Sequence, residues 1–168
     1  MNPDWLKVKE CNVVTTLDSS GKENGYLIDI LNKNDDIMRP RAGEKFQQFY
    51  MSTVYEHMFK GFHIHPTKTD TIHCVHGNIV LAIYPELISK EDSLNAVIDK
   101  EKMIYLELGK NNPKTISFPS KYPHGFFGLD DLSIVINYRI PAWTPDDTYQ
   151  YDVHDHEFAL YMRNKFVK

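Results

Sequence analysis

Histidines gather in one part of this chain. Five of the eight histidines fall between residues 57 and 76, and the segment GFHIHPTKTD, residues 61–70, holds His63 and His65 two positions apart with Asp70 after them. Side chains two residues apart on a β-strand share a face, so both imidazoles can point into one cavity. A turn at 66–69 places Asp70 opposite them on the returning strand of a hairpin. A second segment, FPSKYPHG, adds His124 at the start of another predicted strand.

Three imidazoles and one carboxylate suit two kinds of chemistry. Together they fit one divalent metal ion, Fe, Mn, Ni or Zn, with open positions for substrate; its ligands are then His63, His65, Asp70 and His124. Without a metal, a neutral imidazole near pH 7 is a competent general base, and a nearby carboxylate can orient it. A third interpretation also stays open, in which these polar residues only line a water-filled barrel mouth.

Short runs rich in β-branched and aromatic residues must position these groups. Gly, Pro, Asn or Asp usually separates them, which is typical of an antiparallel sandwich or barrel. The predicted strands cover residues 12–17, 25–30, 45–54, 58–65, 71–75, 78–84, 103–108, 115–118 and 132–138. Two helices are also predicted. One lies within 86–99, and the other spans 157–166 behind Asp155 as its N-cap and packs on the outside of the barrel.

Composition places limits on the partners. The 168 residues are consistent with one domain over 1–168, with a barrel core at about 45–140, N-terminal strands in 1–44 and a helix at about 156–166. A net charge of −4 without a dense basic block argues against a nucleic-acid partner. The apolar runs are too short to span a membrane, and the start lacks the apolar segment of a signal peptide. Two cysteines that form no CxxC pair make the cytoplasm the expected location.

The spacing of the two histidine segments resembles a known pair of motifs. HxH(x4)D(x6)G, followed by PxKxxH, is similar to the two motifs of the cupin superfamily, with Asp70 in the slot usually held by Glu and Lys121 where Gly is usual. The resemblance implies an all-β fold, the double-stranded β-helix or jelly-roll barrel, with a short C-terminal helix added.

A longer resemblance runs through most of the chain. Segments 24–29, 46–52, 60–63, 77–84 and 124–126 are similar, in order and nearly in spacing, to blocks of the dTDP-4-dehydrorhamnose 3,5-epimerase family. Members of that family are metal-free dimers in which a histidine removes the proton beside a 4-keto group and a tyrosine returns one from the opposite face. The resemblance implies His63 as the base. It also implies substrate-binding roles for Gln48, Lys60, Asn24, Asp29 and His124.

Several positions depart from the family pattern. The slot of the proton-returning tyrosine falls on Asn137, and Tyr138 follows one residue later, on the other strand face unless a bulge intervenes. Both are kept as candidate catalytic residues beside His63 and Asp70, although an asparagine is no acid. Lys60 replaces an arginine and Asp70 replaces a lysine, which depletes the cations expected around a pyrophosphate and an enolate. Lys60, Lys68 and Arg139 remain candidates for phosphate contact.

The sequence therefore predicts an isomerase, similar to nucleotide-sugar epimerases, that acts on a nucleotide-linked keto-deoxysugar by proton transfer next to the carbonyl. Loss of the tyrosine favours a change at a single centre. Two alternatives stay open: a mononuclear metal-dependent isomerase or dioxygenase acting on a small polar metabolite, and a non-catalytic sugar-binding cupin. The resemblance also implies a homodimer. Aromatic residues near the pocket blocks, Tyr50 among them, are expected to stack on substrate or pack in the core, and His73 and His76 are expected on a partly solvated strand face.

Overall fold

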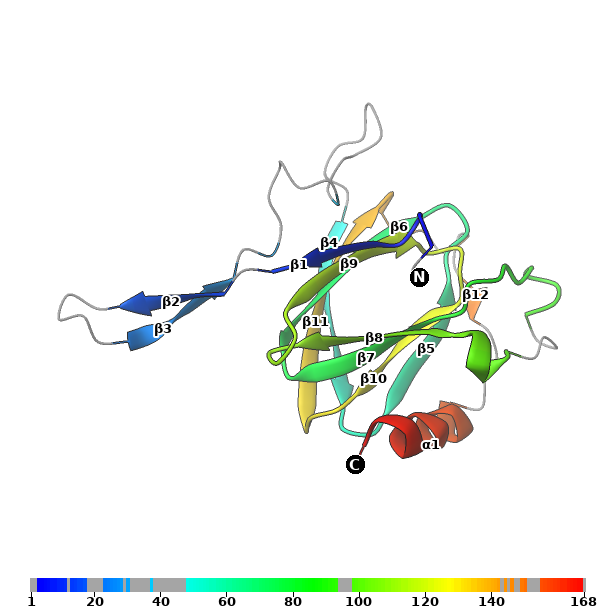
Figure 1. Ribbon diagram of the computed structural model, residues 1–168. Helices are drawn as coiled ribbons and strands as arrows, with labels where there is room; N and C mark the ends of the chain where they lie inside the picture. Colours follow the sequence, from blue (N-terminus) through cyan, green and yellow to red (C-terminus); the bar gives the residue numbers. More distant parts are fainter. Residues whose placement is uncertain are drawn as a thin grey trace.

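A computed structural model describes most of the chain. The described residues are 3–11, 13–17, 23–28, 30, 37, 48–93, 98–142, 144, 146, 149–150 and 155–167. They form two five-stranded antiparallel sheets that face each other, a two-stranded hairpin and one α-helix (Figure 1). This arrangement confirms the predicted all-β fold with a C-terminal helix.

The first sheet has the spatial order β1-β9-β6-β11-β4. In that order its strands span Lys7–Glu10, Lys114–Pro119, Thr69–His76, Leu132–Ile140 and Gln48–Tyr55. Buried residues alternate strictly with half-buried ones along β11, as a strand with one face toward a core requires. The side chains of β11 at 133, 135, 137 and 139 therefore face inward, and those at 134, 136 and 138 face outward.

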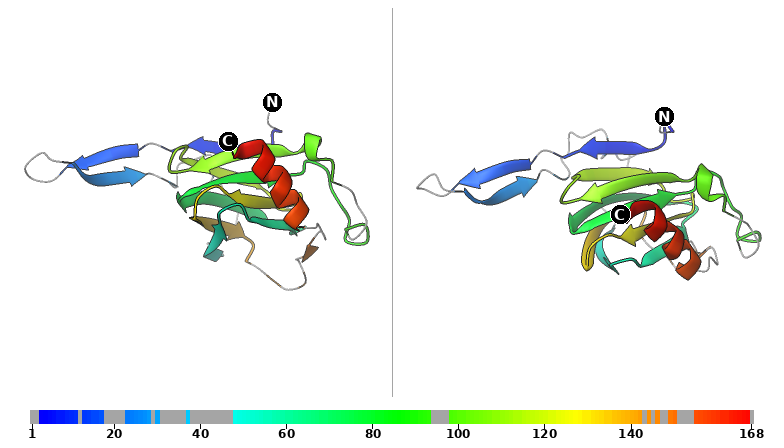
Figure 2. Two further views of the ribbon diagram at one scale, coloured as in Figure 1. Left: turned by 90° about the horizontal axis from the view of Figure 1, so that it is seen from below. Right: turned by 60° about the horizontal axis from the view of Figure 1, so that its bottom comes forward.

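The second sheet has the order β12-β5-β10-β7-β8. Its strands span Tyr149–Gln150, Phe59–Ile64, His124–Gly128, Asn78–Ile83 and Ile104–Gly109, and a short 3-10 helix, η2 (Lys100–Lys102), precedes β8. The remaining described strands, β2 (Val13–Leu17) and β3 (Glu23–Ile28), pair with each other and project from the body as a hairpin (Figures 1 and 2).

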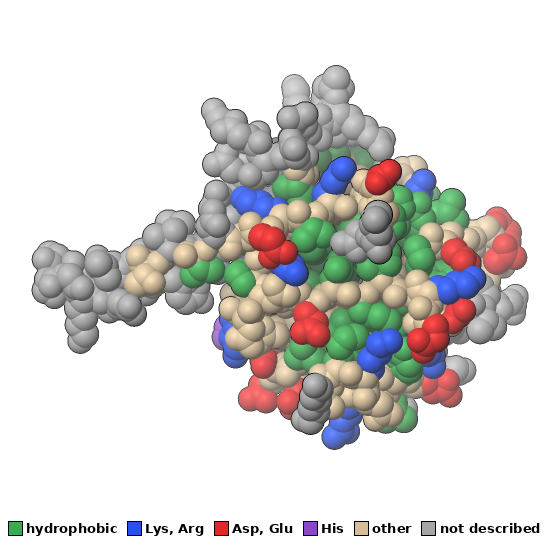
Figure 3. All heavy atoms as spheres, in the orientation of Figure 1, with side chains coloured by type: hydrophobic (Ala, Val, Ile, Leu, Met, Phe, Trp, Pro, Cys, Tyr) green, Lys and Arg blue, Asp and Glu red, His purple; other side chains and the backbone are tan. Residues whose placement is uncertain are grey.

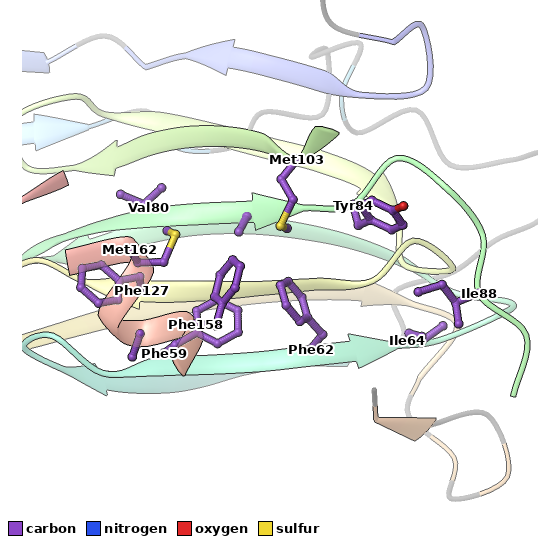
Figure 4. Close-up of a cluster of buried hydrophobic side chains, with 12 residues drawn as sticks. Phe59, Phe62, Ile64, Val80, Tyr84, Ile88, Met103, Phe127, Phe158 and Met162 are labelled. Atoms are coloured by element: carbon purple, nitrogen blue, oxygen red, sulfur yellow. The ribbon is translucent and has the colours of Figure 1, made fainter. Parts of the chain in front are cut away.

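Two hydrophobic clusters stabilise the barrel. One fills the space between the sheets, and its buried members include Ile72, Leu81, Ile116, Phe118 and Val135. The other lies on the outside of the second sheet, beneath α1 (Asp155–Phe166) (Figure 4). Because β7 is buried on both faces, its sequence NIVLAI is apolar almost throughout instead of alternating.

The C-terminal helix packs where the sequence predicts. Phe158 and Met162, one helical turn apart, are both buried against the aromatic rings of Phe59 and Phe62. The helix begins at Asp155, so this residue lies in the first turn instead of preceding it as the cap. Figure 2 shows the helix on the outer side of the second sheet.

Other expectations need correction. Among residues 86–93 and 98–99 the structure contains turns and extended segments but no α-helix. Strand β1 was not predicted, because KVKE carries three charges; its pairing with β9 comes from backbone hydrogen bonds. His73 is buried, with its Nδ1 3.2 Å from the hydroxyl of Thr115, whereas His76 is exposed as expected.

No helix in the described part of the chain has the length and apolar character needed to cross a membrane. On the face shown in Figure 3, basic and acidic side chains are interspersed.

Candidate active site

A cavity of about 390 Å³ opens between the two sheets. Its apolar lining comes from the inter-sheet core, and its polar lining comes from both sheets, an arrangement typical of small-molecule sites. The polar lining residues are Gln48, Tyr50, Ser52, Lys60, His63, His65, Asp70, His124, Asn137 and Arg139. Six of the predicted catalytic and substrate-binding residues line this cavity: Gln48, Lys60, His63, Asp70, His124 and Asn137. His65, predicted as a metal ligand, lines it as well.

The backbones of β5 and β10 bring His63 and His124 together. The two residues are direct partners in the antiparallel register, and their ring centroids are 6.4 Å apart. A Cβ atom added to Gly125 would lie 2.7 Å from the carbonyl oxygen of Lys60, and one added to Gly61 would lie 2.7 Å from the Cα of Gly125. Glycine at both positions therefore allows this close approach of the strands beside the two histidines.

His63 is a neutral imidazole in this environment. Burial lowers its pKa to about 4, and the positive charges of His124 and Lys60 contribute to the same shift. The side chain lines the cavity and is partly exposed to it. An unprotonated histidine is thus available to accept a proton over the whole physiological pH range.

Asp70 is the most heavily engaged group of the site. Arg139, its register partner across β6 and β11, donates Nε–H to Oδ1 at 2.5 Å and Nη2–H to Oδ2 at 2.9 Å. Although burial alone would raise the pKa of Asp70, the hydrogen bonds from His124 and Arg139 hold it well below its usual range. Asp70 is therefore a fixed negative charge paired with the buried guanidinium of Arg139, and His124 Nε2 also lies near it.

The same contacts fix the protons on two histidines. Arg139 Nη2 lies 3.1 Å from His65 Nε2, and because a guanidinium only donates, His65 accepts there and is neutral with its proton on Nδ1. His124 donates Nδ1–H to the carbonyl oxygen of Tyr122 at 2.8 Å, while its Nε2 lies 3.4 Å from Asp70 Oδ2.

His65, Asp70 and His124 form a buried group with one potential ligand atom each within 4.8 Å, so these residue types could hold a metal ion. His63, predicted as a fourth ligand, is not part of this group. The guanidinium of Arg139 lies where a metal ion would bind. It donates hydrogen bonds to both carboxylate oxygens of Asp70 and to His65 Nε2. A metal would have to displace a buried arginine, so the donor set does not fit a metal centre as it stands.

Asn137 has a positioning role. Its Oδ1 accepts from the Thr71 backbone N–H at 3.1 Å, which fixes the orientation of the amide. Its Nδ2 then donates to Asp70 Oδ1 at 2.9 Å and to the Tyr50 hydroxyl at 2.8 Å. Tyr138 faces outward from β11 and does not line the cavity, because the register irregularity of this strand lies at 134/135 and leaves the alternation at 137/138 intact.

The remaining predicted residues lie at the rim or away from it. Lys60 donates to the Ser52 hydroxyl at 2.7 Å and is exposed at the cavity, which Gln48 also lines. Lys68 is buried, donates to the Ala142 carbonyl and is not among the cavity-lining residues. Asn24 lies in β3 of the projecting hairpin, and Asp29 lies outside the described residues.

Sequence reasoning missed two contacts inside the cavity. Arg139 was expected to contact phosphate, but its guanidinium is held by Asp70 inside the barrel. Tyr50 was expected to stack or pack, but its hydroxyl reaches the polar network. The sequence contained a signal for both residues. Tyr50 lies two residues after Gln48, and Arg139 lies two residues after Asn137, so each pair shares one face of a predicted strand.

Comparison with known proteins shows similarity of fold at low sequence identity. No protein-family model and no curated protein matches the chain in sequence. Among solved structures, a dTDP sugar isomerase from Desulfovibrio desulfuricans superposes with a TM-score of 0.67 at 16% identity, over 89% of this chain and 87% of that one. A dTDP-6-deoxy-D-glucose-3,5-epimerase from Legionella pneumophila, bound to dTDP-4-keto-L-rhamnose, superposes with a TM-score of 0.67 at 16% identity. The superposition covers 95% of this chain and 79% of that one.

A third structure is that of a 3'-monoepimerase double mutant from Streptomyces bikiniensis in complex with dTDP. It superposes with a TM-score of 0.63 at 11% identity, over 89% of this chain and 72% of that one. These similarities cover most of the chain in each case. The protein therefore has the cupin fold of the dTDP-sugar epimerases and is strongly divergent from them in sequence.

Proposed function

We propose that this protein is an isomerase that moves a proton at the carbon beside the carbonyl of a nucleotide-linked keto-deoxysugar. The observation that carries the proposal is a neutral His63 facing a cavity whose inner wall holds the guanidinium of Arg139. A base that removes a proton beside a carbonyl produces an enolate. Preorganised positive charge next to that base lowers the free energy of the enolate and of the transition state that leads to it.

Each residue has a distinct part in this reaction. His63 accepts the proton, and Asp70 holds Arg139 and His124 in place without changing its own charge. Lys60, at the rim, supplies the exposed cation for a phosphate of the substrate. With neither Asn137 nor Tyr138 able to act as the family's acid, inversion at one centre is the simplest outcome.

Solved structures with the same fold support the substrate class. The Legionella enzyme is described with dTDP-4-keto-L-rhamnose and the Streptomyces monoepimerase with dTDP. We extend this class to the present chain on the basis of its cavity, which combines a neutral base with buried and exposed cations.

Deuterium uptake tests the proposal. In deuterated water, the protein should exchange the proton beside the carbonyl of dTDP-4-keto-6-deoxyglucose or of another nucleotide-linked 4-keto-6-deoxysugar, followed by NMR. His63→Asn should lower the exchange rate by about 100-fold or more. The control is His76→Asn, which changes an exposed histidine at the end of β6. A wild-type protein that binds these sugars without exchange would instead be a sugar-binding module.

We further infer that the protein is a homodimer whose contact is the outer face of β4 and β11. Among the described strands β4 is the last of its sheet, and its sequence QFYMSTVY contains no charged residue. Edge strands normally carry charges or proline that discourage pairing. Phe49 and Met51 point outward and are 52% and 63% exposed, beside the half-buried Ile136 of β11. A second copy of the chain is the occupant that this apolar face suits.

A further inference from the structure

An epimerase needs a proton donor on the side of the sugar opposite its base. His63 belongs to β5 of the second sheet, which forms one wall of the cavity. The donor must therefore come from the first sheet, which forms the facing wall. Among the described lining residues of that sheet, two carry a hydroxyl group, Tyr50 and Ser52, and both lie on β4.

The two hydroxyls differ in their hydrogen-bond partners. Ser52 accepts from the ammonium group of Lys60 at the exposed rim. Tyr50 reaches the interior network, where its hydroxyl accepts from Asn137 Nδ2 at 2.8 Å. Because Asn137 uses its other amide hydrogen for Asp70 and its oxygen for Thr71, it can only donate to the phenol. The phenol's own hydrogen is consequently left for an acceptor in the cavity.

The ring of Tyr50 is held as firmly as its hydroxyl. Tyr50 and Asn137 are direct partners in the antiparallel register of β4 and β11. The guanidinium carbon of Arg139 lies 5.1 Å from the centre of the Tyr50 ring, so the ion pair with Asp70 also fixes this aromatic side chain. Burial, aided by the negative charge of Asp70, raises the pKa of Tyr50, which keeps the phenol protonated.

We propose that Tyr50 is the general acid of this site, delivering its phenolic proton to the face of the sugar carbon opposite His63. This assignment rests on the proposed isomerase function. It explains why Asn137 occupies the position at which the resembled family carries its acid. In this assignment the phenol belongs to β4, and Asn137 on the neighbouring β11 positions it.

The two steps balance without a further reactant. His63 takes the proton as the C–H bond breaks, and the electron pair of that bond passes into the enolate. The O–H bond of Tyr50 then breaks, its hydrogen forms the new C–H bond as the enolate electrons return to carbon, and a phenolate remains. Solvent protonates the phenolate and removes the proton from His63, which restores both residues.

Tyr50→Phe separates the base step from the acid step. With dTDP-4-keto-6-deoxyglucose in deuterated water, the variant should still exchange the proton beside the carbonyl at a rate within about 10-fold of wild type, because His63 can return a solvent-derived deuteron to the face it came from. Formation of the inverted epimer should fall by about 100-fold or more. Tyr161→Phe is the matched control, because Tyr161 lies on α1 and does not line the cavity.

The other outcomes overturn the assignment, and they identify which claim has failed. Unchanged epimer formation in Tyr50→Phe would exclude Tyr50 as the acid, and equal loss of exchange and inversion would show that the residue only supports the cavity. Wild-type protein that exchanges but never inverts would overturn the role of Tyr50 alone. Wild-type protein that neither exchanges nor inverts any nucleotide-linked 4-keto-6-deoxysugar would overturn the proposed function and this assignment with it.

A second variant covers the case in which Tyr50→Phe is unstable. Tyr50→3,5-difluorotyrosine keeps the shape of the ring and makes the phenol more acidic. The pH above which inversion declines should move downward, while the pH dependence of exchange should stay as in wild type. A purely structural role for Tyr50 predicts no movement of that pH, and this result would contradict the proposal.

Discussion

Asp70 and Arg139 face each other across β6 and β11 and form a buried ion pair through two hydrogen bonds. The pair has more than one consequence, because Arg139 also contacts His65 and stacks on Tyr50, and Asp70 also accepts from Asn137. One charge pair thereby fixes the tautomer of a histidine and the position of a phenol.

Asp70→Asn should lower the free energy of unfolding by about 3–5 kcal/mol, because it leaves the Arg139 guanidinium buried without a charged partner. Chemical denaturation at pH 7 measures the change. Asp131→Asn, at an exposed position before β11, should change stability by less than about 0.5 kcal/mol. Equal stabilities of the two variants would show that the ion pair contributes little.

The difference in unfolding free energy between wild type and Asp70→Asn should decrease at low pH. The folded-state pKa of Asp70 is depressed, so its contribution to stability is fully present above the unfolded-state pKa of about 3.9 and is lost as the pH falls toward the folded-state value. The stability gap between wild type and Asp70→Asn should therefore be constant from pH 7 to about pH 5. It should narrow below about pH 4.

Metal analysis tests whether Arg139 keeps a metal ion from binding to His65, Asp70 and His124. Protein purified without a histidine tag or chelator should contain far less than one equivalent of Fe, Mn, Ni or Zn per chain, and a chelator should leave its melting temperature unchanged. The reason is that Arg139 already neutralises Asp70 and donates to His65. One metal ion per chain that is lost in His65→Ala would contradict this account and favour a metal-dependent cupin.

Lys60→Met should weaken the binding of dTDP by about 10-fold, or about 1.4 kcal/mol, because the ammonium is the exposed cation at the cavity rim. Titration calorimetry measures the affinity, and the difference from wild type should shrink at high salt. Lys110→Met removes a cation beside Asp130, away from the cavity, and should bind dTDP as wild type does. An unchanged affinity in Lys60→Met would place the phosphates elsewhere.

Light scattering should find two chains per particle at micromolar concentrations. Met51→Lys, alone or with Phe49→Lys, should shift the protein to a monomer, since it places a charge in the centre of the apolar outer face of β4. Leu160→Lys, at an exposed apolar position on α1, is the matched control and should leave the dimer intact. A wild-type monomer would contradict the assignment of this face.

Local rules made part of the site predictable. His63 and His65 share a face because strand side chains alternate, and Asp70 faces them because proline and polar residues form the turn before β6. The helix was predictable for a similar reason, since Phe158 and Met162 repeat at helical spacing. Each of these inferences depends on residues close together in sequence.

The rest of the site depends on which strands pair. Arg139 meets Asp70, 69 residues away, only because β11 lies beside β6, and Asn137 meets Tyr50 only because β11 also lies beside β4. Alternation places these side chains on inward faces, but it does not select their partners. The contacts of Arg139 with Asp70 and His65, and of Asn137 with Tyr50, were for this reason visible only in the folded chain.

The pH dependence of deuterium exchange beside the carbonyl, measured with dTDP-4-keto-6-deoxyglucose and related nucleotide-linked sugars, tests the central claim most directly. Because the pKa of His63 is lowered to about 4, the exchange rate should stay high down to about pH 5, decline with a midpoint near pH 4, and be nearly abolished in His63→Asn. Exchange that persists in His63→Asn, or no exchange with any of these sugars at any pH, would contradict the assignment of His63 as the catalytic base.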